Sequence, residues 1–244
     1  MLRNLFTAVQ NGDVYSLIAI IITSVILIFL CLPSHEFAHA WAATKLGDNT
    51  AKYQGRLTLN PLKHLDLIGT AMMLLIGVGY AKPVPVNMFN LKNRKKDMAL
   101  IALAGPMMNL AFGIVFAFFN ILFVKFVCIP AMLRGYINIS LLNLYSVIQF
   151  ALSTTAQISI SLAIFNLIPI PPFDGSRILG FFLPDRVYYK IMQYEQIIFI
   201  VVMVLLLGGF LSGPLANMMD NVLNGIYWLL CLPFGGISSF GGML

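Results

Sequence analysis

The sequence has 244 residues, of which 59% are hydrophobic and 10% are charged, and its mean hydropathy is +0.89. Soluble domains carry about 25% charged residues, so this composition excludes a water-soluble globule and predicts a chain surrounded by lipid. The net charge of +6 does not indicate nucleic acid as a partner, because the basic residues crowd the segments between apolar runs, where anionic headgroups would face them.

The first apolar run, at residues 14–32, carries no charge and leads directly into Pro33-Ser34-His35. A helix that spans a bilayer needs about 20 apolar residues, so this run predicts the first membrane helix, retained rather than removed as a signal peptide. Residues 47–64 are polar and strand-like, and residues 82–87 are too rich in proline for a helix. We predict that short strands from these two segments pair into a small sheet at the membrane surface.

The remaining apolar runs lie at residues 67–81, 98–124, 135–173, 196–219 and 221–244. The run at 67–81 is short enough either to span or to re-enter, and the run at 135–173 predicts one long helix followed by a proline-rich re-entrant loop. The expected fold is an all-α polytopic membrane protein with about five to six membrane segments and a small surface β-sheet near the active site.

No linker is long enough to separate a soluble domain. We therefore expect one membrane-embedded domain over residues 1–244, with a core at about 14–183 and C-terminal helices at about 190–244.

The motif that carries chemistry is His35-Glu36-Phe37-Ala38-His39, an HExxH sequence at the end of the first run. Side chains four residues apart lie on one face of a helix, so both imidazoles can reach a single tetrahedral Zn²⁺, and Glu36 lies where it can take a proton from water on the metal. Such matches also occur by chance in ordinary helices. Ionisable groups at membrane depth are costly, however, and are functional by default, so the sequence predicts a zinc site.

A catalytic zinc ion needs a third protein ligand and one open position. The candidates are His64, Asp174 and Asp66. Asp174 follows three prolines that break the preceding helix, and irregular backbone is tolerated at membrane depth only where protein or a watery cavity surrounds it. Its alternative role is to cap a helix that starts at Ser176. For His64 we favour a surface position near the loop.

Three motifs stand in order along the chain: HEFAH at 35–39, GPMMN at 105–109, and the proline-rich stretch at 166–175 that ends in Asp-Gly. With these motifs the chain, over about residues 30–180, resembles the site-2 protease family of intramembrane zinc metalloproteases, in its short prokaryotic branch without a PDZ domain. The resemblance implies a membrane core of three helices, one zinc ion per chain bound by His35, His39 and Asp174, and Glu36 as the general base.

The resemblance also implies that Asn109 and Asn166 face the active site. There an amide could hydrogen-bond an oxyanion or hold an unwound substrate, whereas the alternative is hydrogen bonding between helices. The pair Gly105-Pro106 would permit close helix approach and a local kink. Residues 92–96, four of them basic, predict a headgroup anchor or a topology signal.

The predicted function is zinc-dependent endopeptidase action on peptide bonds within or near transmembrane segments. The predicted location is a prokaryotic inner membrane with the active site nearer the cytoplasm, because residues 47–64 and the following loops are basic. The expected partners are transmembrane protein or peptide substrates and the bilayer, with no nucleic acid; a homo-oligomer or a regulatory membrane partner stays open. The rivals are a divalent-metal transporter, which needs several ligand clusters along a path, and a catalytically inactive relative.

Overall fold

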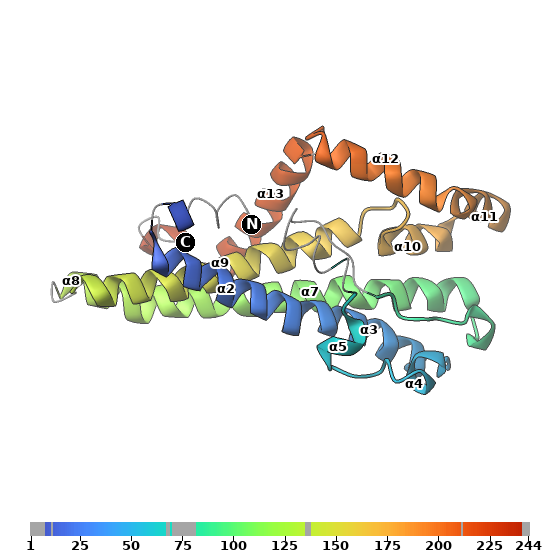
Figure 1. The fold of residues 1–244 in the computed structure, drawn as a ribbon, viewed down its shortest axis with the longest axis horizontal. Helices are drawn as coiled ribbons and strands as arrows, with labels where there is room; N and C mark the ends of the chain where they lie inside the picture. The colour runs from blue at the N-terminus through green and yellow to red at the C-terminus, as the bar shows by residue number, and fades with distance from the viewer. Residues whose placement is uncertain are drawn as a thin grey trace.

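The computed structural model describes residues 8–10, 12–66, 69, 82–134, 138–210 and 212–240. Within these ranges the protein is built of helices, and no strand is formed. Three continuous helical stretches are long and apolar enough to cross a membrane: Val14–Lys45, Arg94–Leu133 and Ile139–Asn166. They lie side by side and form the body of the protein (Figure 1).

The first stretch consists of α2 (Val14–Ile26), the π-helical turn η1 (Leu27–Cys31) and α3 (Leu32–Lys45). Asp13 caps its start by accepting a hydrogen bond from the backbone N–H of Ser16. The widened turn η1 directly precedes Pro33, whose ring would clash with the preceding turn of a regular helix. The chain can therefore stay helical through Pro33 into the HExxH motif.

The second stretch consists of α7 (Arg94–Phe123), the π-helical turn η3 (Val124–Cys128) and α8 (Ile129–Leu133), and the third is α9 (Ile139–Asn166). Helix α7 packs along both α9 and α3, and α2 packs on α9. Gly113 permits the close approach of α7 to α9, because a Cβ atom there would lie 2.4 Å from Cγ1 of Ile160. The predicted span at 98–124 and the predicted long helix in 135–173 are confirmed.

Large apolar side chains remain exposed along the outer faces of these helices. On α2, for example, Ile21 is 56% exposed and Val25 is 49% exposed. Lipid in place of water makes such exposure favourable, since acyl chains are as apolar as the side chains.

The C-terminal end of the first stretch lies against the N-terminal end of the second. Ala42 and Ala43 of α3 pack in one buried cluster with Leu91, which precedes α7, and with Met98 and Ile101 from the start of α7. The basic residues at 92–96 therefore lie at the same end of the protein as the end of α3.

Residues 47–64 are not strand-like, so that prediction is wrong. They form two short helices, α4 (Thr50–Tyr53) and α5 (Pro61–His64). Helix α5 begins with Asn60 as the capping residue and proline at the first helical position, a pairing that starts helices rather than strands.

The segment at 82–87 has no regular secondary structure and pairs with no strand among the described residues. Its carbonyl groups at Lys82 and Pro83 instead accept hydrogen bonds from the guanidinium group of Arg56. The sheet predicted from the two segments is therefore not found, because a side chain from one segment takes the backbone acceptors of the other.

The run at residues 67–81 was predicted either to span the membrane or to re-enter it. Apart from Gly69, it lies outside the described residues. The two flanks of this segment are nevertheless joined, because the backbone N–H of Lys82 donates to the carbonyl of His64 at 2.8 Å. His64 and Lys82 therefore lie next to each other, at the end of the protein that carries α4 and α5.

The later helices are α10 (Asp174–Phe182), α11 (Asp185–Gln193), α12 (Glu195–Leu207) and α13 (Ser212–Cys231). The predicted single span at 196–219 is wrong, because the helix breaks after α12 and Gly209 adopts a positive φ of 78°. Helices α11 and α12 meet at 62° and together could form a fourth span. The described residues thus hold three or four candidate spans, and the predicted five or six are not confirmed.

The short turns η2 (Met88–Asn90), η4 (Leu232–Phe234) and η5 (Ile237–Phe240) complete the described helical elements. The last two lie where α13 packs on α7, and Lys125 donates a hydrogen bond to the carbonyl of Phe234. This contact ties the C-terminal turns to the end of the second stretch that lies away from residues 92–96.

Asp48 connects the loop after α3 to the segment before α7. It is fully buried, and its carboxylate accepts hydrogen bonds from the backbone N–H of Thr50, the side chain of Asn90 and the backbone N–H of Asn87. Burial by itself would raise the pKa of Asp48, but these hydrogen bonds outweigh it and hold the pKa below its usual value. The ionised carboxylate therefore stabilises this end of the protein.

We expect Asp48→Asn to lower the unfolding midpoint by about 5 °C, because an amide NH₂ would face the N–H of Asn87 and leave a buried donor without an acceptor. The stabilisation by Asp48 is complete above the pKa of an unfolded aspartate, about 3.9, and is lost as pH falls through its lower folded-state pKa. Thermal unfolding in detergent at neutral and acidic pH measures both effects. Asp220→Asn, at an exposed position, is the control, and an equal shift in both variants would contradict the assignment.

Candidate metal centre

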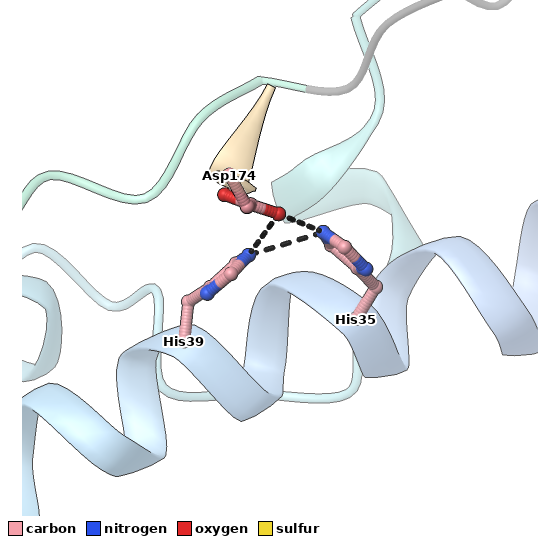
Figure 2. A group of neighbouring side chains, drawn as sticks. All are labelled: His35, His39 and Asp174. Atoms are coloured by element: carbon pink, nitrogen blue, oxygen red, sulfur yellow. Dashed lines mark hydrogen bonds and ion pairs between the residues drawn. The ribbon is translucent and has the colours of Figure 1, made fainter. Parts of the chain in front are cut away.

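The two histidines of the HExxH motif lie one turn apart on α3 and point toward the same point in the interior (Figure 2). His35 is 6% exposed and His39 is 8% exposed. Their Nε2 atoms are 3.0 Å apart, and the two rings meet edge to face. The helical spacing thus produces the paired arrangement that the sequence predicts.

Asp174, the first residue of α10, completes the group. Its Oδ2 atom lies 3.3 Å from Nε2 of His35 and 3.3 Å from Nε2 of His39 (Figure 2). Among the described residues, these three form the one group of histidine, cysteine and acidic side chains with the spacing of a metal site. Of the three candidate third ligands, Asp174 is therefore the residue that the fold brings to the histidines.

The alternative role of Asp174 as a helix cap is wrong. Helix α10 begins at Asp174 itself, and the capping position is Phe173, which provides no side-chain hydrogen bond. The hydroxyl of Ser176 donates to the carbonyl of Phe173. The carboxylate of Asp174 is thus left to face the imidazoles.

The other two candidates lie elsewhere. His64 is not on the surface, as we predicted, but is fully buried, and its Nε2 atom lies 2.7 Å from the carbonyl of Thr58. Helix α5, which carries His64, packs against α3 and η1. Asp66 accepts a hydrogen bond from the backbone N–H of Gly69.

The glycine after Asp174 explains how the loop can reach the metal centre. A Cβ atom at Gly175 would lie 2.3 Å from the carbonyl oxygen of Leu167 and 2.5 Å from that of Ile168. The loop after α9 therefore folds back directly onto the start of α10, and the ring of Phe173 packs on Phe165 of α9 with centroids 4.3 Å apart. Only a residue without a side chain fits this turn.

Helix α7 forms the wall behind the two histidines. A Cβ atom at Gly105 would lie 2.3 Å from Nε2 of His39 and 2.6 Å from Cε1 of His35. The predicted role of this glycine in close helix approach is confirmed, and what approaches is the imidazole pair itself. The carbonyl of Ile101, one turn earlier, lies 2.7 Å from Nδ1 of His39.

These contacts determine which nitrogen of His39 is free. Since a carbonyl only accepts, Nδ1 carries the proton that it donates to Ile101, and Nε2, which faces Asp174, is the nitrogen left to bind a metal ion. A ring nitrogen held in this way by a backbone carbonyl is the usual arrangement of a metal-binding histidine.

Asn109 holds the second histidine. It is 1% exposed, and its Nδ2 atom lies 3.1 Å from Nδ1 of His35. Its Oδ1 atom is buried without a hydrogen-bond partner. A half-turn of the amide would place Oδ1 where it accepts a proton from Nδ1, and the orphaned acceptor would be satisfied. That orientation is the one expected when Nε2 of His35 binds a metal.

The donor set fits a zinc ion. Ligand bonds of about 2.0–2.2 Å at tetrahedral angles separate neighbouring ligand atoms by about 3.3 Å. The three facing atoms of His35, His39 and Asp174 are 3.0, 3.3 and 3.3 Å apart. Two imidazoles and one carboxylate also form a ligand set of catalytic zinc, which leaves the fourth position open.

Glu36 is 8% exposed, and its Oε2 atom is buried with no hydrogen-bond partner. An unpaired buried carboxylate oxygen is unfavourable, so this side chain is suited to a partner that arrives during a reaction. Asn166 is the last residue of α9, and its Nδ2 donates to the carbonyl of Leu162. The fold places Asn166 at the start of the loop that delivers Asp174.

The model of peptidase family M50 matches residues 23–209 of the chain. The chain belongs to peptidase family M50. The match confirms the resemblance to site-2 proteases and includes all the residues of the metal centre. Peptidases of this family are membrane proteins, in agreement with the three apolar stretches.

Similar proteins are named zinc metalloproteases. The "Putative zinc metalloprotease YwhC" of Bacillus subtilis is 36% identical over 205 residues, which cover 79% of this chain and 85% of that protein. A protein named in the same way, Rip2 of Mycolicibacterium smegmatis, is 27% identical over 228 residues, covering 89% of this chain and 76% of the relative. No solved structure is significantly similar. The M50 peptidase is accordingly a zinc metalloprotease.

Sequence reasoning missed the contacts that orient the ligands. It treated Gly105 as a helix-packing residue and Asn109 as a group facing substrate, and it gave no role to the carbonyl of Ile101. The motif at 105–109 marks this region of α7, but a motif does not say which atoms a glycine lets approach.

Proposed function

We propose that this M50 peptidase is a zinc-dependent intramembrane endopeptidase that hydrolyses peptide bonds within or near transmembrane segments of membrane proteins. The observation that supports this most directly is the meeting of His35 and His39, which lie within the apolar stretch Val14–Lys45, with Asp174, which the loop after the stretch Ile139–Asn166 delivers. The proposal treats residues 1–244 as one membrane-embedded domain.

In this proposal His35, His39 and Asp174 hold the zinc ion, which when bound lowers the pKa of a water ligand to about 7 and polarises a carbonyl group. Glu36 takes a proton from the attacking water and returns it to the leaving amine. Its buried carboxylate oxygen without a partner is consistent with such a role.

The residues around the ligands orient them. The carbonyl of Ile101 holds the ring of His39, and we propose that Asn109 holds the ring of His35. Contact of Asn109 or Asn166 with a substrate oxyanion stays a prediction. A substrate helix must unwind before hydrolysis, because its carbonyls are occupied by internal hydrogen bonds.

We further propose that the end of the protein near the metal centre faces the cytoplasm of a prokaryotic cell. The positive-inside rule assigns the side richer in lysine and arginine to the cytoplasm. Of the fifteen such residues, Lys125 and Arg134 lie toward the far end of the Arg94–Leu133 stretch, and Arg3 lies outside the described residues. The others lie in the segments that meet near α3, α10 and the start of α7.

The transporter hypothesis receives no support from the described ranges of the chain, where one metal-ligand group is found rather than a series along a path. The hypothesis of an inactive relative would leave Glu36 without a function. Neither has an observation in its favour.

The test is Glu36→Gln, which keeps the size of the side chain and removes the base. We expect cleavage to fall by at least about 100-fold, while one zinc ion per chain remains bound. Membrane fragments from cells with the wild-type protein and with the variant, compared by mass spectrometry, identify the substrates, and metal analysis of the purified proteins measures zinc.

His64→Gln is the matched control, because it changes a second buried residue at the same end of the protein outside the metal centre. It is expected to retain cleavage. Full activity in Glu36→Gln would refute the role of the base, and transport of zinc into sealed vesicles without cleavage of any membrane protein would favour the transporter.

A further inference from the structure

A pocket lies apart from the metal centre, between the start of α7 and helices α10 and α11. Its volume is about 810 Å³, within the range of about 300–1,000 Å³ that is usual for ligand pockets. One wall consists of residues 92–96, four of them basic, and the other includes Phe181, Tyr188 and Tyr189. Neither zinc binding nor peptide hydrolysis uses these residues.

Most of the positive charge around this pocket has no counter-charge. Lys95 forms an ion pair with Asp185, at 2.6 Å, and also donates to the carbonyl of Leu183. In the part of the chain that the structure describes, no carboxylate lies within 4.0 Å of the other three basic groups of residues 92–96. These are the exposed residues Lys92, Arg94 and Lys96. Three cations around one pocket create a positive potential that attracts an anion.

The pocket also lies at the level expected for lipid headgroups. Helix α7 becomes apolar from Met98, one turn after Lys95, and the apolar helix α12 follows α11. Next to the pocket Phe182 is 73% exposed and Tyr189 is 58% exposed, and exposed aromatic side chains are typical of the membrane–water interface. An anion attached to acyl chains therefore suits this position better than an anion from solution.

From this charge and placement we infer that the pocket binds the phosphodiester headgroup of an anionic phospholipid. Lys92, Arg94 and Lys96 contact the phosphate, and the aromatic wall lies beside the acyl chains. Basic pockets at the cytoplasmic ends of membrane helices bind anionic headgroups by the same electrostatics.

The experiment titrates the purified protein in neutral detergent with phosphatidylglycerol and measures bound lipid by native mass spectrometry. Each basic residue near an anionic lipid strengthens binding by about fivefold, so Lys92→Gln with Lys96→Gln should weaken phosphatidylglycerol binding about 25-fold. Phosphatidylcholine, whose headgroup has no net charge, is expected to bind weakly to both proteins. The measurement uses Glu36→Gln protein, so its outcome does not depend on peptide hydrolysis.

The matched control is Lys52→Gln with Lys63→Gln, which removes the same charge from exposed positions on α4 and α5 at the same end of the protein. It is expected to bind phosphatidylglycerol as the wild type does. Equal losses in the two double variants, or no loss in either, would overturn the inference. Displacement of the lipid by inorganic phosphate at equal concentration would also overturn it, since the ligand would then be the free anion.

A variant with the opposite effect separates binding from a loss of structure. Asp185→Asn removes the counter-charge of Lys95, which frees a fourth cation for the headgroup. We expect phosphatidylglycerol to bind about fivefold more tightly, a gain that damage to the fold would not produce. Weaker binding in this variant would count against the pocket.

Discussion

Asp174→Ala is expected to reduce bound zinc from one ion per chain to a trace. The carboxylate is the third of three protein ligands and lies 3.3 Å from both imidazole nitrogens. Removing an outer group that orients a ligand already lowers metal affinity by about 10–100-fold, so removing a ligand should cost at least 100-fold. Metal analysis after dialysis against a weak chelator, together with competition by a fluorescent zinc indicator, measures the loss.

The decisive comparison is with His64→Gln. Sequence alone leaves both residues as candidate third ligands, but the structure places His64 against the carbonyl of Thr58. We therefore expect His64→Gln to keep its zinc. Zinc retained in Asp174→Ala and lost in His64→Gln would reverse the assignment of the third ligand.

Gly105→Ala should disrupt the metal centre, although it adds only one methyl group and leaves His35, His39 and Asp174 unchanged. The new Cβ would lie 2.3 Å from Nε2 of His39 and 2.6 Å from Cε1 of His35. Either α7 moves away, which breaks the hydrogen bond from His39 to Ile101, or the imidazoles rotate away from Asp174. We expect zinc affinity to fall by about 100-fold and cleavage to be lost with it.

The same substitution should stabilise α7 as a helix, because alanine stabilises a helix relative to glycine by about 1 kcal/mol. A loss of zinc is therefore not due to a lower helix propensity of α7. Gly225→Ala on α13, where a Cβ atom meets nothing within 4 Å, is the control and should retain zinc and activity. Zinc bound normally by Gly105→Ala would show that α7 does not form the wall of the site.

The three residues predicted as ligands lie together in the structure, and the sequence could indicate them because helical spacing marks two of them and an isolated charge marks the third. His35 and His39 are four residues apart on one helix, so their meeting needs only helical geometry. Asp174 lies 135 residues from His39. The residues by themselves gave three candidates for the third ligand, Asp174, His64 and Asp66, and the family resemblance selected Asp174. The structure agrees, because Gly175 lets the loop fold back toward α3.

The errors concern segments whose hydrogen bonds are not local. Residues 47–64 have a polar, strand-like composition, yet Asn60 and Pro61 start a helix and Arg56 takes the acceptors that a partner strand would have used. The span predicted at 196–219 has apolar residues on both sides of a break that its hydropathy does not reveal. Composition measures preference for lipid, whereas the position of a bend depends on backbone conformation, here at Gly209.

By itself the sequence determined that this is a helical membrane protein with two histidines spaced to share a metal ion and a nearby glutamate, since apolar length and helical spacing are properties of short segments. The tertiary structure decided which acidic group meets that pair, which atoms of α7 hold the rings, and that residues 92–96 surround a pocket with α11. These depend on the packing of helices distant in sequence, which no local pattern records.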